Sequence, residues 1–375
     1  MGKKPWEKPM FKRLFSIISA LCLLLALAAC GPAQPAPEES GGRVVEDALG
    51  REVRVPETVE SIVVLGNTPR MAVYLGLADM VAGYSGLARE SVTPLAAYAY
   101  VTLDDWAEVP SVGTDSGGNT AYYSEEIILT NADVIFCTAT GDVADELQRE
   151  TGIPCLSVSQ GTLFGEDMEQ SLRIMAEVCG VQERAEAIFD YVDGCFAELE
   201  SLTGGIPESE RKTALPAAAT FRGTHGIEGV RANDPVMLSV NALNAADALS
   251  DGYESFTVDK EQILAWNPEY IFLDSGGVPL VRQDYAAHSD YYAELSAVAL
   301  GRVYQYPSST SYYDNMEISL LNCYFVGSVL YPERFAEVDF EAKAAEIFGF
   351  FLGDEDYLDV LAGYGAYYGT VELDA

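Results

Sequence analysis

The chain has 375 residues, of which 49% are hydrophobic and 11% aromatic, so it can bury substantial cores and is long enough for two domains. It carries 58 acidic against 22 basic residues, a formal charge of −36. So acidic a surface repels nucleic acid and anionic lipid headgroups, which argues against a nucleic-acid-binding protein.

The N-terminus predicts export and anchoring. Basic residues between Lys3 and Arg13 precede an apolar run over residues 14–29, the order typical of a secretory signal peptide, expected over residues 1–29. The run ends in Leu-Ala-Ala-Cys, which resembles the lipobox of bacterial lipoproteins and makes Cys30 the predicted lipidation site. A plain signal peptide with an incidental cysteine is the alternative. Residues 30–42 predict a flexible tether. We therefore expect an extracytoplasmic protein held on the cell membrane by lipid.

From residue 43 the sequence alternates between short apolar segments and amphipathic ones. A hairpin is expected over residues 43–55. The expected strands are residues 62–66, 80–84, 134–138, 154–158, 214–220, 270–273 and 303–306. The expected helices include residues 69–77, 124–130, 237–249 and 315–330. Short buried strands alternating with helices predict an α/β fold with mainly parallel sheets.

One long helix is predicted near the middle of the chain. Apolar residues recur every three or four positions from Val181 to Leu202, the spacing of an amphipathic helix, and Gly204 and Pro207 follow it. We expect an N-terminal α/β lobe over residues 43–180, a linker helix over 181–203, and a C-terminal α/β lobe over 204–375. An ordinary surface helix of a single domain is the alternative.

An internal repeat favours two lobes. Residues 124–137 align with residues 260–273 at an offset of 136, with Glu, Ile, Asn, Ile and Phe at matching positions. Each copy reads as a helix that leads into a buried strand. The prediction is therefore two Rossmann-like lobes joined by one long α-helix.

The chain lacks the common catalytic and metal-binding motifs. Its two histidines are 63 residues apart, and the sequence contains no H-E-x-x-H, G-x-S-x-G or Walker A motif. Five cysteines follow Cys30, with no C-x-x-C, so they predict buried thiols or one disulfide. We expect neither an enzyme nor a metal site built from protein ligands.

Polar and aromatic residues gather instead in the loops that follow predicted strands, where ligands bind in open α/β sheets. Tyrosine offers an apolar face and a phenol, and arginine offers a planar fork for anions. The loop with Arg222 and His225 is the strongest candidate, whereas a tyrosine taken alone is more often a packing residue. The candidate ligand contacts are Asn67, Tyr84, Asp115, Phe221, Arg222, His225, Phe256, Tyr312 and Tyr313.

Taken together, these features resemble the substrate-binding lipoproteins of ABC importers for iron complexes and vitamin B12. The resemblance covers residues 43–355 and is carried by residues 47–56, 61–65, 75–83 and 330–335 and by the two E-x-I-x-x-x-N-x-x-x-I-F blocks. It implies a monomer that holds its ligand between the lobes and docks on a permease dimer with its ATPase. It also adds Thr114 to the candidate contacts. Glu125 and Glu261 match the family's docking glutamates; stabilisation of a helix N-terminus is their alternative role.

The candidate residues point to an iron complex as the ligand. The family's tryptophan-rich cobalamin pocket is not reproduced, because Trp106 and Trp266 lie elsewhere in the sequence. Tyrosines with Arg222 and His225 favour an anionic Fe(III)-siderophore, with haem second and no intrinsic cofactor. Cobalamin and a chelated oxyanion remain alternatives for the ligand. A surface lipoprotein enzyme or a sensor remains the alternative class of protein.

Overall fold

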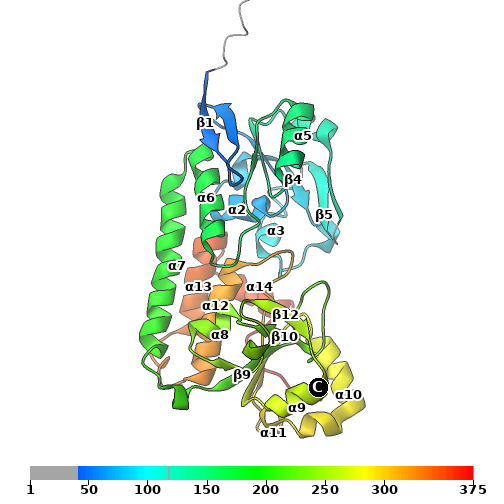
Figure 1. Ribbon diagram of the computed structural model, residues 1–375, viewed down its shortest axis with the longest axis vertical. Helices are drawn as coiled ribbons and strands as arrows, with labels where there is room; N and C mark the ends of the chain where they lie inside the picture. The colour runs from blue at the N-terminus through cyan, green and yellow to red at the C-terminus, as the bar shows by residue number, and fades with distance from the viewer. Residues whose placement is uncertain (1–40, 117–118, 375) are drawn as a thin grey trace, which may run out of the picture. The chain divides into compact units, whose positions relative to one another are not determined.

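The computed structural model of the protein describes residues 41–116 and 119–374 (Figure 1). The predicted signal peptide, Cys30 and most of the predicted tether lie outside these residues. Residues Val44–Ala375 form one compact unit. The expected hairpin is present as β1 (Gly42–Glu46) and β2 (Glu52–Pro56).

The first lobe is built on a mainly parallel sheet. Its strands are β3 (Ile62–Val64), β4 (Val81–Gly86), β5 (Ser111–Ser116), β6 (Asn119–Tyr122), β7 (Val134–Cys137) and β8 (Cys155–Ser157), in the order β6-β5-β4-β3-β7-β8. Only the β5–β6 pair is antiparallel. The lobe's helices are α2 (Thr68–Tyr74), α3 (Ala97–Val101), α4 (Ser124–Thr130), α5 (Gly141–Thr151) and α6 (Glu166–Cys179). Strands β3, β7 and β8 are buried throughout, as strands covered on both faces should be.

The second lobe contains a larger mixed sheet. Its strands are β9 (Thr213–Ala217), β10 (Gly229–Ala232), β11 (Leu243–Asn244), β12 (Glu254–Thr257), β13 (Tyr270–Asp274), β14 (Val303–Tyr306) and β15 (Gly369–Thr370). Their order is β12-β10-β9-β13-β14-β15, with β11 beside β9. Strands β9, β11, β13 and β14 are parallel, whereas β10, β12 and β15 pair antiparallel at the sides. The lobe's helices are α8 (Pro235–Ser239), α9 (Lys260–Trp266), α10 (Val278–Ala293) and α11 (Ser296–Ala299). The predicted α/β fold with two lobes is confirmed.

One predicted helix is wrong. Residues 237–249 do not form a single helix, because α8 ends at Ser239 and β11 begins at Leu243. Asn241 between them has a φ of 56°, a left-handed conformation that stops a helix and that asparagine tolerates better than most residues.

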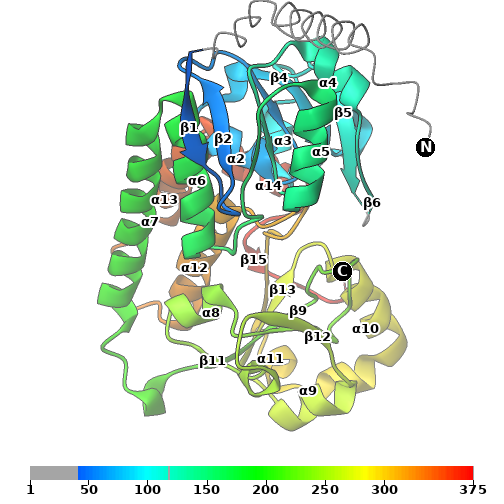
Figure 2. The same cartoon turned by 45° about the horizontal axis from the view of Figure 1, so that its top comes forward.

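The long helix α7 (Gln182–Thr203) is present as predicted and connects the two lobes (Figures 1 and 2). It packs against α6 and against α12 (Met316–Leu330). Helices α13 (Phe340–Leu352) and α14 (Tyr357–Gly363) follow α12, and α13 packs against α2 and α3 of the first lobe.

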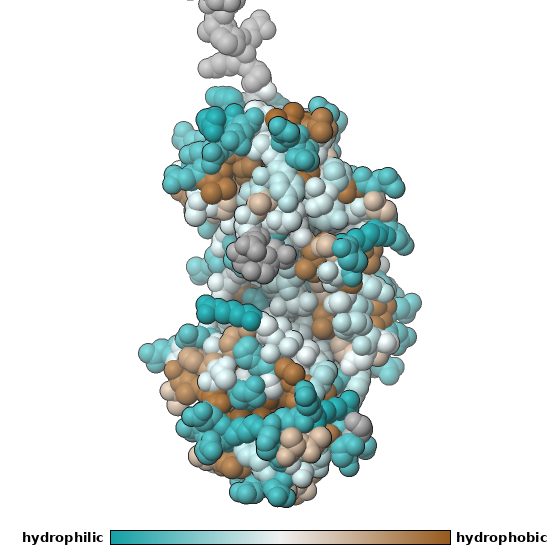
Figure 3. All heavy atoms as spheres, turned by 90° about the vertical axis from the view of Figure 1, so that its right-hand side faces the viewer, coloured by the Kyte–Doolittle hydropathy of each residue, from teal (hydrophilic) through white to brown (hydrophobic). Residues whose placement is uncertain are grey.

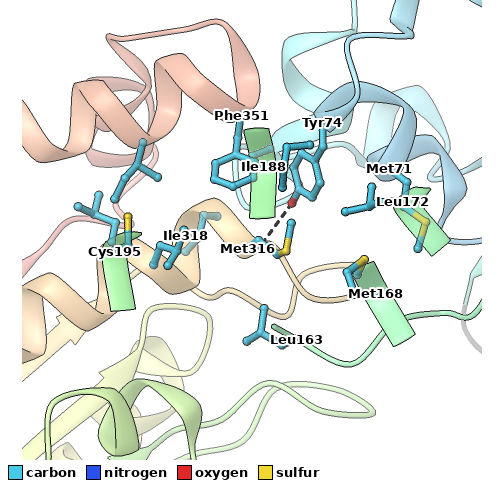
Figure 4. Close-up of a cluster of buried hydrophobic side chains, with 14 of the residues drawn as sticks. Met71, Tyr74, Leu163, Met168, Leu172, Ile188, Cys195, Met316, Ile318 and Phe351 are labelled. Atoms are coloured by element: carbon cyan, nitrogen blue, oxygen red, sulfur yellow. Dashed lines mark hydrogen bonds between the residues drawn. The ribbon is translucent and has the colours of Figure 1, made fainter. Parts of the chain in front are cut away.

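A shared hydrophobic core joins the halves. One cluster of buried side chains contains Met71 of α2, Ile188 of α7 and Phe351 of α13 (Figure 4). The Tyr74 hydroxyl also accepts a hydrogen bond of 3.2 Å from the backbone N–H of Met316 and donates one of 2.5 Å to Glu317. Each lobe has its own sheet and a smaller core cluster of its own, and the shared cluster joins the two lobes.

The sequence repeat corresponds to a repeated helix–strand unit. Helices α4 and α9 each bury an isoleucine completely, Ile127 and Ile263. Each helix ends at an asparagine in the left-handed conformation, Asn131 with a φ of 52° and Asn267 with a φ of 42°. Each then leads into a strand inside its sheet, β7 or β13. The matched residues thus fill the core and end the helix at equivalent places.

No helix within the described part of the chain is long and apolar enough to cross a membrane.

The shared core predicts that the two lobes unfold together. Replacing Phe351, which is 1% exposed, by alanine should lower the free energy of unfolding by about 3–5 kcal/mol through lost burial and the cavity left behind. Urea unfolding followed by circular dichroism and tryptophan fluorescence measures this. The control Leu300→Ala removes a side chain that is 61% exposed and should change stability by about 0.5 kcal/mol or less. Two separate transitions would show that the shared core does not couple the unfolding of the lobes.

Candidate ligand-binding site

A cavity of about 480 Å³ lies at the carboxyl ends of β5, β7 and β8, the edge where open α/β sheets bind ligands. We name it the β5–α5 cavity. It is lined by Asp115, Thr120, Tyr122, Ser124, Thr138, Ala139, Thr140, Val143, Glu146, Leu147, Glu150, Gln160 and Tyr313. Figure 3 shows this side of the molecule, where the surface is hollowed between the half with β5 and α5 and the half with α10.

The cavity is completed by a residue from the other half of the chain. Tyr313, in the loop between β14 and α12, donates its hydroxyl to Asp115 Oδ2 at 2.8 Å. Thr120 donates to the other carboxylate oxygen of Asp115, also at 2.8 Å. Burial raises the pKa of Tyr313, and the Asp115 carboxylate raises it further, so the phenol stays protonated. Both lobes therefore contribute to one wall.

Tyr313 is held there in an unusual backbone conformation. Tyr312 and Tyr313 have φ values of 50° and 69°, the left-handed region that bulky residues rarely adopt. The guanidinium of Arg70, a completely buried residue of α2, donates to the carbonyl of Tyr312 and, at 3.2 Å, to Oδ1 of Asn315. Such strain persists only where the surroundings enforce it. Arg70 supplies that enforcement, and the sequence did not single it out, although it is the one charged residue of the helix predicted at residues 69–77.

Asn67 supports this arginine. Its Oδ1 accepts from Arg70 at 2.5 Å, and its Nδ2 donates to the carbonyl of Gln160 at 2.7 Å. Because the residue is 3% exposed, its amide is engaged inside the protein. Asn67 therefore supports Arg70 from inside the protein and does not line the β5–α5 cavity.

The wall of the cavity is acidic. Residues Val143, Glu146, Leu147 and Glu150 form one face of α5, the i, i+3, i+4, i+7 pattern, and all four line the cavity. Ser124 donates its hydroxyl to Glu150 at 2.6 Å. Arg149 lies 3.4–3.5 Å from Glu146 and Glu150 but is not among the residues that line the cavity. None of the sequence patterns indicated this acidic face.

Phe221, Arg222 and His225 occupy a tight loop between β9 and β10. The rings of Phe221 and His225 stack with centroids 4.0 Å apart. Arg222 is exposed at the tip, with a φ of 49°, and no ion pair to it is found within residues 41–116 and 119–374. The structure brings Phe221 and His225 into contact, but none of the three residues lines the β5–α5 cavity.

The remaining candidates lie outside the cavity. The ring of Tyr84 packs against that of Trp106 at an angle of 35°, with centroids 5.2 Å apart. Thr114 is exposed on β5, where its side chain and that of Asp115 point to opposite faces of the strand. Phe256, on β12, packs against the core of the second lobe. Tyr312 stacks edge-on against Tyr313, and its buried hydroxyl has no partner among the described residues.

A buried ion pair fixes the strand ends of the second lobe. Arg231 of β10 donates to Asp274 at the end of β13 and to Thr310, each at 3.0 Å. Ser308 also donates to Asp274, at 2.9 Å. This network ties the loop after β14 to the second sheet, just as Arg70 ties it to the first lobe.

Glu125 and Glu261 are exposed in the first turns of α4 and α9. Ile128 and Leu129 of α4 are also exposed, Leu129 by 78%. The matched glutamates are thus available to a partner, one on each lobe. Among the described residues, the five cysteines form no disulfide with one another.

Comparison with known proteins agrees with this architecture. Residues 57–310 match a family model described as periplasmic binding protein. The chain belongs to this family. Members of this family bind solutes outside the cytoplasmic membrane, so the protein is an extracytoplasmic binding protein.

Solved structures of the same fold include binding proteins with different ligands. A periplasmic solute binding protein from Veillonella parvula is 21% identical, with 87% of this chain and 98% of that one covered and a TM-score of 0.68. Molybdate-bound MolA of Haemophilus influenzae is 18% identical, with coverage of 83% and 98% and a TM-score of 0.64. A protein of an Fe³⁺-hydroxamate transport system from Saccharomonospora viridis is 18% identical, with coverage of 77% and 99% and a TM-score of 0.50. Comparison with curated proteins finds no match. At these identities the likeness concerns the fold.

Removing the Arg70 guanidinium should destabilise the protein strongly. Arg70→Met would leave the carbonyl of Tyr312 and the side chains of Asn67 and Asn315 without a buried donor, which should cost on the order of 3 kcal/mol in the free energy of unfolding. The control Arg89→Met alters a guanidinium that is 50% exposed and should have little effect. Chemical unfolding of both variants measures the difference. Equal stability of the two would show that Arg70 does not hold the loop.

Proposed function

We propose that this protein captures a ferric siderophore between its lobes and delivers it to an ABC importer. The observation that carries the proposal is the β5–α5 cavity, whose wall on the first lobe is completed by Tyr313 of the second half. Its volume suits a small-molecule chelate. The Fe³⁺-hydroxamate transport protein of the same fold supports this ligand class.

The proposed ligand contacts come from both lobes. Asp115 and Tyr313 line the cavity, and Tyr312 lies beside them. Phe221, Arg222 and His225 follow β9, at the corresponding strand ends of the second sheet. Haem is the second candidate. The phenyl ring of Phe221 offers a flat apolar face, and the imidazole of His225, stacked on it, offers a ligand for haem iron.

The rest of the assembly follows from the same proposal. The mature protein is a monomer, anchored through lipidated Cys30 and the tether of residues 30–42, with the lobes and α7 divided as predicted. Glu125 and Glu261 dock it on the permease dimer, one lobe on each subunit. Their exposure in equivalent helices of the two lobes supports this pairing.

Titration with ferric complexes tests the ligand class. Ferric siderophores should quench the fluorescence of tyrosine and tryptophan saturably, whereas the iron-free siderophores should bind more weakly because their chelating arms are not preorganised. Haem and cobalamin are titrated in parallel. Mass spectrometry of protein purified from native membranes identifies any ligand that it carries. Failure of every ferric siderophore to bind, with haem or cobalamin binding instead, would refute the siderophore assignment.

Replacing both docking glutamates should separate transport from binding. Glu125→Ala with Glu261→Ala should abolish uptake and leave the affinity for the ligand unchanged, because neither residue lines the cavity. The matched control is Glu126→Ala with Asp259→Ala, which alters the neighbouring exposed carboxylates and should retain uptake. Uptake of radioactive iron and binding titrations measure the two properties. Weakened binding in the double mutant would contradict a docking role.

A further inference from the structure

We infer that the β5–α5 cavity receives a positively charged, hydrogen-bond-donating group of the ligand, such as an ammonium or guanidinium group. The inference rests on the proposed function and names the class of ligand within it. It reverses the sign of charge expected from Arg222 and His225 for this part of the site.

The charge of the cavity favours a cation. Three carboxylates line it, those of Asp115, Glu146 and Glu150, and no lysine, arginine or histidine is among its lining residues. Arg149 pairs with the two glutamates, and these three side chains are 40–69% exposed, so solvent screens their charges; the half-buried Asp115 is screened less. An anionic group in the cavity would face like charges, whereas a cation would be attracted.

The direction of the hydrogen bonds within the cavity wall favours a ligand that donates hydrogen bonds. The hydroxyls of Tyr313 and Thr120 both donate to Asp115, and the hydroxyl of Ser124 donates to Glu150. Each hydroxyl has a single proton, so these three groups keep only lone pairs to offer. This part of the wall therefore presents acceptors, both carboxylate and hydroxyl oxygens, and a ligand that brings donors fits it. Thr138, Thr140 and Gln160, elsewhere in the lining, can also donate.

Two of the three carboxylates, those of Asp115 and Glu150, are also held by hydroxyl groups before binding. Both oxygens of Asp115 are fixed by hydroxyls at 2.8 Å, and Arg70 holds the loop that carries one of those hydroxyls. Glu146 and Glu150 project from the same face of α5. Fixed acceptors lose little conformational entropy on binding and so favour a ligand that matches them. The volume, about 480 Å³, accommodates an organic cation with its chain.

A pair of ferric complexes that differ in one charge tests the inference. Ferrioxamine B carries a free ammonium group at the end of a flexible chain, and N-acetylferrioxamine B has the same iron centre with that charge removed. The complete mature protein should bind the ammonium form on the order of tenfold more tightly at low ionic strength, and salt should reduce the difference. Isothermal titration calorimetry measures both affinities. Equal affinity, or tighter binding of the acetylated complex, would overturn the inference.

Substitutions locate the effect in the cavity. Glu146→Gln with Glu150→Gln should remove most of the preference for the ammonium form while leaving the affinity for the acetylated complex unchanged. The control Asp190→Asn with Asp193→Asn removes the same number of charges on α7, none of whose residues line the cavity, and should keep the preference. A preference that survives in the cavity double mutant would place cation recognition elsewhere and overturn the assignment.

Further probes separate this inference from the proposed function. Tighter binding of an anionic ferric complex, such as ferric citrate, than of either ferrioxamine would keep the iron proposal and overturn the cationic one. Binding of 1,5-diaminopentane, together with failure of every ferric complex, would keep the cation site and refute the iron proposal. Binding of none of these probes would overturn both.

Discussion

The buried guanidinium of Arg70 is the contact on which the site depends. It is completely buried in α2 of the first lobe, no carboxylate of the described residues forms an ion pair with it, and carbonyl and amide oxygens with the ring of Tyr98 surround it. An arginine can satisfy several acceptors at fixed angles, which a lysine cannot. Its hydrogen bonds hold Tyr312 and Tyr313 in left-handed conformations and so place the Tyr313 hydroxyl on Asp115. The wall of the cavity follows from this one contact.

The fold could be predicted because its signals are local. Apolar runs predicted the central strands, the three-and-four spacing predicted α7, and the repeat predicted matching helices in the two lobes. The error over residues 237–249 was also local in cause. A left-handed asparagine at 241 ends a helix that composition alone would continue, and asparagine occurs in helices too often to signal a stop by itself.

The site could be predicted only in part, because side-chain roles depend on contacts that are distant in sequence. The rule that ligands bind at the carboxyl ends of strands predicted Asp115 and Tyr313, which line the cavity. The same rule selected Asn67, whose amide is engaged by Arg70 and by the carbonyl of Gln160, 93 residues away. It could not select Glu146 and Glu150, since they lie on a helix and the chain has 58 acidic residues. Only the position of α5, which faces β5 and β6 across the cavity, distinguishes them from the other surface carboxylates.

The shared core and the contacts of the loop after β14 limit how far the two lobes can open. Lobes joined by a flexible linker alone would close around a ligand and could adapt to its charge. Here α7 and α13 contribute to a core common to both halves, and Arg70 and Arg231 bind the loop after β14 from opposite lobes. Opening the lobes widely would break buried hydrogen bonds to charged groups, each worth about 1.5–3 kcal/mol. The cavity is therefore largely preformed, and under the proposed function the arrangement of its acceptors, rather than a closing motion, would select among ligands.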